Sequence, residues 1–66
     1  MTIVVNGTPT SIGPGSTLED LLVALALPDR GVALALDGEV VPRRAWPDTG
    51  IPAGARVEVV TAMQGG

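Results

Sequence analysis

The sequence contains no cysteine, no histidine and no lysine. Without cysteine the chain has no disulfide and no thiol nucleophile. Without histidine it lacks the usual general base near neutral pH and the commonest metal ligand. Covalent catalysis would fall to a serine or threonine with no histidine to activate it. The composition therefore argues against an enzyme, and no metal-binding constellation is visible.

Positive charge and long apolar runs are also scarce. The chain contains four arginines and seven acidic residues, so the net charge is −3 and the pI ≈ 4.4. This balance disfavours nucleic-acid binding, which needs a basic surface, and suits a partner with a basic surface. The longest apolar run covers residues 21–27, far short of the roughly 20 residues of a membrane span. Residues 1–5 lack the basic start of a signal peptide, so we expect a cytoplasmic protein.

What the sequence does contain fits one small folded domain. It has 66 residues, of which 45% are hydrophobic, enough to argue against disorder. A chain of this length buries only about 60% of its unfolded surface, so the core should be thin.

The first half of the chain predicts a hairpin followed by a helix. Residues 2–6 are rich in β-branched side chains, and Asn6-Gly7 is a strong signal for a type I′ turn into a second strand over residues 8–12. Pro9 places that second strand at a sheet edge. A helix then begins at Ser16 or Thr17, each of which has an acidic residue three positions on, and stops at Pro28. Its expected apolar stripe consists of Leu18, Leu21, Leu22 and Leu25.

The second half predicts another hairpin and a last strand. Residues 32–36 and 39–41 form strands around an Asp37-Gly38 turn, and the leucines of the first should face the helix. Residues 43–50 read as an irregular connection, residues 52–55 as a turn, and residues 56–62 as the final strand. This order of elements is that of the α+β, ubiquitin-like β-grasp fold, with one helix packed across a mixed sheet of four to five strands.

Two features of the connection have alternative interpretations. Trp46, the single aromatic residue, either anchors an interface or covers one end of the core, and the second fits a chain without other aromatics better. Arg43 and Arg44 either contact a partner or form a solvated loop, and solvated pairs are the commoner case.

The last residues, Met63-Gln64-Gly65-Gly66, predict a flexible tail attached to a domain of residues 1–62. Four extended residues reach about 13–14 Å, enough to enter a partner's active site. Two glycines carry no Cβ, so the end of the chain can pass through a narrow slot. The carboxylate of Gly66 can then be activated as an acyl-adenylate and converted to a thiocarboxylate. A Gly-Gly ending also arises by chance or as an expression remnant.

Several segments together resemble the ThiS family, the sulfur carriers of thiamine biosynthesis. They are Asn6-Gly7, Gly38 to Arg43 followed by Trp46, and the whole ending from Arg56 to Gly66. The resemblance implies that a ThiF-type, E1-like enzyme adenylates Gly66 with ATP, so the chain itself binds no cofactor. A sulfur-donating protein and a ThiG-type thiazole synthase are the further partners that it implies. Asp37, where the family often has asparagine, and the stiff Gly13-Pro14-Gly15 turn are departures that leave the tail untouched.

We expect partners to contact the tail and the end of the last strand, where an exposed apolar patch would help docking. The residues concerned are Val60, Ala62, Met63, Gln64, Gly65 and Gly66.

Three other functions compete with a thiamine sulfur carrier. The small subunit of molybdopterin synthase also ends in Gly-Gly on a β-grasp domain, although it tends to be longer. A protein modifier joined through Gly66 is a second possibility, and the absence of lysine prevents lysine-linked chains of this protein on itself. A binding module of RNA-associated enzymes is the third, and the acidic charge disfavours it.

Overall fold

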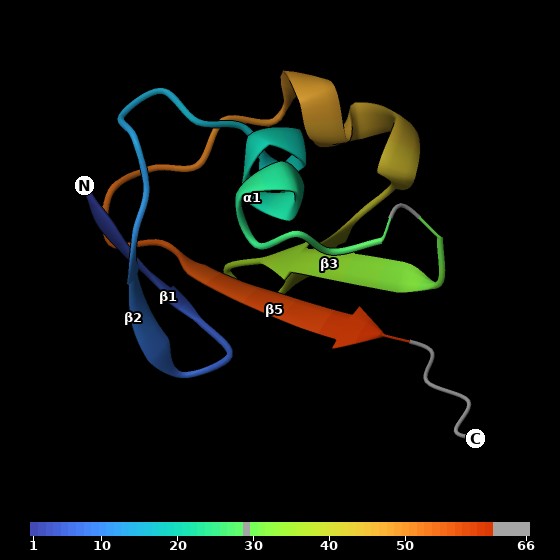
Figure 1. Cartoon of the computed structure of the whole chain (residues 1–66), viewed down its shortest axis with the longest axis horizontal. Helices are drawn as coiled ribbons and strands as arrows, with labels where there is room; N and C mark the ends of the chain where they lie inside the picture. The colour runs from blue at the N-terminus through green and yellow to red at the C-terminus, as the bar shows by residue number, and fades with distance from the viewer. Residues whose placement is uncertain (29, 62–66) are drawn as a thin grey trace.

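The computed structural model describes residues 1–28 and 30–61, and Figure 1 shows their arrangement. Within these residues the elements follow the order β1 (Thr2–Val5), β2 (Thr8–Ser11), α1 (Leu18–Ala24), β3 (Val32–Leu36), β4 (Glu39–Val41), the 3-10 helix η1 (Arg43–Asp48) and β5 (Arg56–Thr61). Of these, α1 is too short to cross a bilayer, and the described residues hold no helix that is long and apolar enough to do so.

The strands form one mixed sheet in the order β2-β1-β5-β3-β4. The last strand, β5, lies in the centre, parallel to β1 and antiparallel to β3. Both α1 and η1 lie on the same side of this sheet (Figure 1). The predicted β-grasp arrangement is therefore confirmed with five strands, and β2, which contains Pro9, lies at an edge as expected.

Both predicted two-residue turns are present. Val5 pairs with Thr8 across Asn6-Gly7, and Leu36 pairs with Glu39 across Asp37-Gly38. Asn6 has φ 50° and Asp37 has φ 51°, and the glycine after each also has a positive φ. Type I′ turns require a positive φ at both central positions, which asparagine, aspartate and glycine tolerate best.

The start of α1 is fixed by Thr17, one of the two expected caps. The Thr17 hydroxyl oxygen accepts from the Asp20 N–H at 3.2 Å, and the Asp20 carboxylate accepts from the Thr17 N–H at 2.9 Å. This reciprocal capping box satisfies two N–H groups that the first helical turn leaves without partners. Ser16 instead donates its hydroxyl to the Gly13 carbonyl at 2.6 Å.

The helix ends earlier than Pro28, and this corrects the predicted apolar stripe. The Ala26 N–H donates to the Val23 carbonyl and the Leu27 N–H to the Leu22 carbonyl, both at 3.0 Å. These two bonds form a Schellman motif, which requires a left-handed residue after the cap. Leu25 is that cap residue and is 36% exposed, while Leu27 packs against the core in its place.

Ala26 occupies the left-handed position with φ 54°, where glycine is the usual residue. Replacing Ala26 with glycine should raise the free energy of unfolding by about 0.5–1 kcal/mol, because the relief of strain exceeds the added chain entropy. Ala24→Gly, the same change inside α1, should lower it by a similar amount. Urea unfolding of both variants checks the prediction, and an equal sign for the two would contradict it.

The connection over residues 43–50 is more regular than expected, because most of it forms η1. The Ala45 N–H donates to the Pro42 carbonyl at 2.9 Å and the Thr49 N–H to the Trp46 carbonyl at 3.3 Å. Bonds between residues three apart define a 3-10 helix, which is too short to leave an apolar period in the sequence.

The core lies between the sheet and the two helices. Trp46 is buried, and its indole N–H donates to the Val41 carbonyl at 2.9 Å, so it covers the core as expected. Each fully buried aliphatic side chain contributes about 2 kcal/mol, which makes a small core sufficient for a domain of this size. The buried residues are Ile3, Leu18, Leu21, Leu22, Leu34, Trp46, Ile51, Ala55 and Val57.

Candidate functional site

The central strand β5 carries the chain to its C-terminal residues. Gly66, Gly65, Gln64, Met63 and Ala62, all predicted to contact partners, lie outside the described residues. The structure therefore describes the strand β5 that leads to this site, as far as Thr61. β5 is paired with β3 along its length, so its end at Thr61 has a defined place in the sheet.

On its other side β5 extends past β1. The parallel pairing between these strands ends where Val5 lies opposite Val57, because β1 turns at Asn6. The side chain of Asn6 continues the ladder in place of a strand. Its amide donates to the Val59 carbonyl at 3.1 Å, and its carbonyl oxygen accepts from the Val59 N–H at 2.8 Å. Asn6 thus satisfies both backbone groups of a residue close to the end of β5.

The second hairpin turn holds the beginning of β5 in a related way. The Asp37 N–H donates to the Arg56 carbonyl at 2.7 Å, and the Asp37 carboxylate accepts from the Arg56 N–H at 2.9 Å. The residues that open the two turns therefore bind the backbone of the same central strand, three positions apart. Sequence reasoning identified both as turn residues and missed this second role, because nothing in an Asn-Gly or Asp-Gly pair shows what its side chain will meet.

The face of the sheet away from the helices carries an exposed apolar strip. Side chains alternate along β5, with Val57 buried under the helices and Val60 on the opposite, open face, 63% exposed. On this face Val60 is paired with Ala33, and Ala35 is paired with Val40, which is 72% exposed. Because the two alanines are small, the valines project beyond them. We call these four residues the open-face patch.

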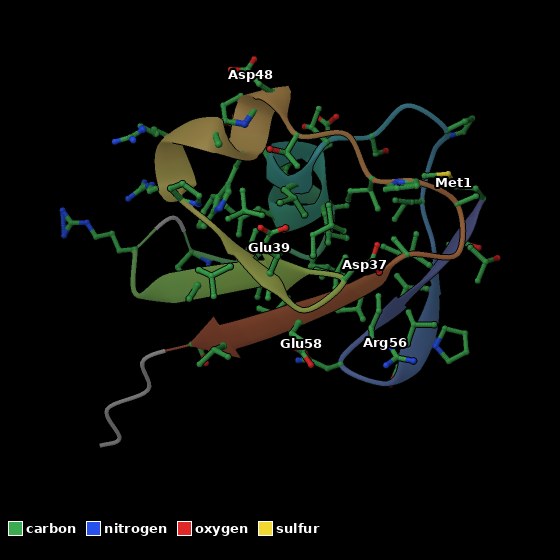
Figure 2. The ribbon with its side chains drawn as sticks, turned by 180° about the vertical axis from the view of Figure 1, so that it is seen from behind. Met1, Asp37, Glu39, Asp48, Arg56 and Glu58 are labelled. Carbon is green, nitrogen blue, oxygen red and sulfur yellow. The ribbon has the colours of Figure 1, made fainter. Side chains whose placement is uncertain are left out.

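Charged groups border the open-face patch. Figure 2 shows Arg56 and Glu58 on the side of β5 away from the helices, with Asp37 on the adjacent turn. Asp37, Gly38, Gly54, Arg56 and Glu58 line a shallow hollow of about 330 Å³. The mixture of an arginine with two carboxylates gives the margin of the patch the polar character of an interface rim.

Of the predicted docking residues, Val60 can be placed, and it is exposed as expected. Within residues 1–28 and 30–61 no three acidic residues, histidines or cysteines converge in a way that could hold a metal ion. The open-face patch is apolar, and the side chains of Asn6 and Asp37 are hydrogen-bonded to the backbone of β5. Their arrangement suits the presentation of a chain end to a partner.

Comparisons with known proteins agree with this geometry. The model of the ThiS family matches residues 3–66. A crystal structure of the thiamine biosynthesis protein ThiS from Geobacter metallireducens is similar at 33% identity, covers all of both chains and superposes with a TM-score of 0.85. An NMR structure of a thiamine biosynthesis protein from the same organism gives the same identity and TM-score and covers this chain fully and 88% of the other. No curated protein matches significantly.

Proposed function

We propose that this chain, which belongs to the ThiS family, is a sulfur carrier of thiamine biosynthesis with Gly66 as its working residue. The observation that carries the proposal is the family match, because it runs through the last residue of the chain. Residues 1–62 serve as the domain that partners recognise and residues 63–66 as the arm that enters their active sites, and the protein works in the cytoplasm.

The proposed chemistry takes place at the terminal carboxylate. A carboxylate oxygen of Gly66 attacks the α-phosphorus of ATP in the active site of a ThiF-type enzyme, and pyrophosphate leaves. A sulfur-donating protein then supplies sulfur at the oxidation level of sulfide, which attacks the acyl carbon and displaces AMP, so that the product is a thiocarboxylate. The thiocarboxylate sulfur finally bonds to an electrophilic carbon of an intermediate held by a ThiG-type thiazole synthase. The acyl–sulfur bond then breaks, and the Gly66 carboxylate is regenerated with an oxygen from the intermediate or from water. ATP belongs to the activating partner, and the carrier is a co-substrate with no catalytic side chain of its own.

The fold supports this role by fixing where the arm begins. β5 is held on one side by β3 and on the other by β1 and Asn6, so Thr61, the last described residue, has a defined position in the sheet. Catalysis benefits when reacting groups are positioned in advance, since a misplacement of about 1 Å can cost roughly 100-fold in rate.

We propose the open-face patch as the surface that docks the activating enzyme. Val60→Asp should weaken the apparent affinity for a ThiF-type enzyme by about tenfold or more, because a charge is then buried in the interface. Val60→Thr keeps the β-branched shape and should cost less.

Val23→Asp on α1 is the matched control, since Val23 is 73% exposed but lies on the helix side of the sheet. The KM for the carrier in pyrophosphate release gives the measurement. Equal effects at Val60 and Val23, with unchanged unfolding curves, would rule out the patch.

Complementation separates the proposed pathway from its closest rival. In a strain that lacks its own thiamine sulfur carrier, expression of this chain should restore growth without added thiamine. In a strain that lacks the small subunit of molybdopterin synthase, it should not restore molybdenum-cofactor enzymes. The reverse pattern would favour the molybdopterin role, and isopeptide adducts of Gly66 on other proteins would favour a modifier.

A further inference from the structure

Asn6 is the single asparagine of the chain, and Gly7 follows it. A peptide nitrogen can attack the side-chain amide carbon of a preceding asparagine and close a succinimide ring. Glycine hinders this attack least, because it has no Cβ and its backbone is free to adapt. Both residues are exposed, and a Cβ built on Gly7 meets nothing within 4 Å. The local sequence therefore favours deamidation of Asn6, and water reaches the turn freely.

The fold opposes this reaction, because it directs the Asn6 amide at β5. The amide donates to the Val59 carbonyl at 3.1 Å and accepts from the Val59 N–H at 2.8 Å. The backbone N–H of Asn6 also donates to the Val57 carbonyl at 2.9 Å. To close the ring, Cγ of Asn6 must swing onto the Gly7 nitrogen, so the amide has to leave Val59. A local opening at the end of β5 releases it at less cost than unfolding the whole domain.

We propose that Asn6 is a deamidation site that reacts when the end of β5 opens, with water as the co-reactant. In the opened state the Gly7 nitrogen gives up its proton and bonds to Cγ of Asn6, and the side-chain nitrogen leaves as ammonia. Water then adds to either ring carbonyl and breaks the bond between that carbon and the Gly7 nitrogen, which takes up a proton. Cleavage at Cγ leaves aspartate, and cleavage at the backbone carbonyl carbon leaves isoaspartate. Neither step needs an oxidant or a reductant.

Either product weakens the attachment of β5. An ionised aspartate has no donor for the Val59 carbonyl, so one of the two bonds is lost and two acceptors face each other. An isoaspartate carries its side-chain methylene in the main chain. The two-residue turn then gains a backbone atom and no longer fits the pairing of Val5 with Thr8. The modified chain therefore opens more readily along the strand that leads to its C-terminal residues.

Intact mass spectrometry follows the reaction, because conversion of an amide to an acid changes the mass. The full chain is incubated at mildly alkaline pH in sodium chloride, and a second sample is unfolded in guanidinium chloride of the same concentration. We expect the unfolded chain to deamidate at least about 30-fold faster, the equilibrium factor that corresponds to two hydrogen bonds of ordinary strength. Fragmentation should place the change at Asn6 and not at Gln64, the single glutamine.

Variants away from the turn separate local opening from unfolding of the whole domain. Ala26→Gly and Ala24→Gly lie at the end of α1 and are expected to shift the global stability in opposite directions. Both should deamidate within about twofold of the original rate, because opening of the end of β5 leaves α1 folded. Gly7→Val tests the chemistry. In guanidinium chloride, where folding plays no part, its β-branched side chain should slow the reaction by about tenfold or more.

The consequence for β5 is measured on the modified chain. The isoaspartate form is separated by chromatography, and Asn6→Asp reproduces the other product. Both should unfold at a lower urea concentration than the original chain. An unchanged midpoint for the isoaspartate form would show that the modification does not weaken β5.

The proposal fails if the folded chain deamidates as fast as the unfolded chain, since the bonds to Val59 then give Asn6 no protection. It also fails if neither sample gains the mass, if the change lies at Gln64, or if the rates of the two α1 variants follow their global stabilities. Because the readout is the mass at Asn6 and not sulfur transfer, these outcomes do not depend on the sulfur-carrier role.

Discussion

Removing Gly66 should abolish adenylation of the chain by a ThiF-type enzyme while leaving the folded domain as stable as before. The deletion draws the carboxylate back by one residue, about 3.3–3.6 Å. A displacement of that size from an in-line attack position should reduce the rate of ATP-dependent pyrophosphate release by at least about 100-fold. Stability should not change, because all the buried residues within 1–28 and 30–61 lie between positions 3 and 57.

Two further variants show that the position of the carboxylate is the cause. One additional glycine after Gly66 moves the carboxylate outward and should also prevent activation. Ala26→Gly changes the end of α1 without changing the length of the chain and should be adenylated at the original rate. Pyrophosphate release and urea unfolding are measured on all variants. Activation that persists without Gly66 would refute the proposed role of this residue.

Replacing Asn6 should destabilise the domain strongly although the residue is exposed on its surface. Asn6→Ala removes both hydrogen bonds to Val59, each worth about 1 kcal/mol, and leaves alanine at φ 50°, where it is strained by about 1 kcal/mol. A total near 2–3 kcal/mol is a large part of the roughly 3–10 kcal/mol available to a chain of this length.

Glycine substitutions separate the hydrogen bonds from the strain. Asn6→Gly removes two side-chain bonds to β5 without strain, whereas Asp37→Gly at the other turn removes one. Because a hydrogen bond to a carboxylate is worth roughly twice a neutral one, the two substitutions should cost similar amounts, about 2 kcal/mol each. Amide hydrogen exchange adds a local readout, because the Val59 N–H should lose protection in Asn6→Gly while the Val57 N–H keeps it. If Val59 exchanges as in the original chain, the side chain of Asn6 does not secure β5.

Local patterns in the sequence were sufficient to predict most of the fold. The two type I′ turns, the capped start of α1 and the edge position of Pro9 each depend on residues close in the chain. Two predictions needed correction. One was the end of α1, and the other was the connection over residues 43–50, most of which forms the short 3-10 helix η1. Leu25 has helical spacing, but the left-handed Ala26 ends the helix beside it, and the partly buried Leu27 packs against the core instead.

Only part of the candidate site could be predicted from the sequence. The terminal glycines are visible in the sequence, and so is an apolar Val60 near the end of the last strand. The open-face patch was not, because Val40 and Val60 are placed on the same face of the sheet only by the pairing of β5 with β3 and of β3 with β4. The two hydrogen bonds between the Asn6 side chain and the Val59 backbone join residues 53 positions apart, and no local sequence pattern encodes such a pairing.

Intact mass spectrometry of the terminus tests the sulfur-carrier role most directly. The full chain is incubated with a ThiF-type enzyme, ATP and a sulfur-donating protein, and its mass is compared with a sample that lacks ATP. We predict a mass increase equal to the exchange of one oxygen for one sulfur, located by fragmentation to Gly66 and absent without ATP. An unchanged mass in the presence of an activating enzyme that adenylates the chain, or a sulfur found at any other residue, would contradict this role.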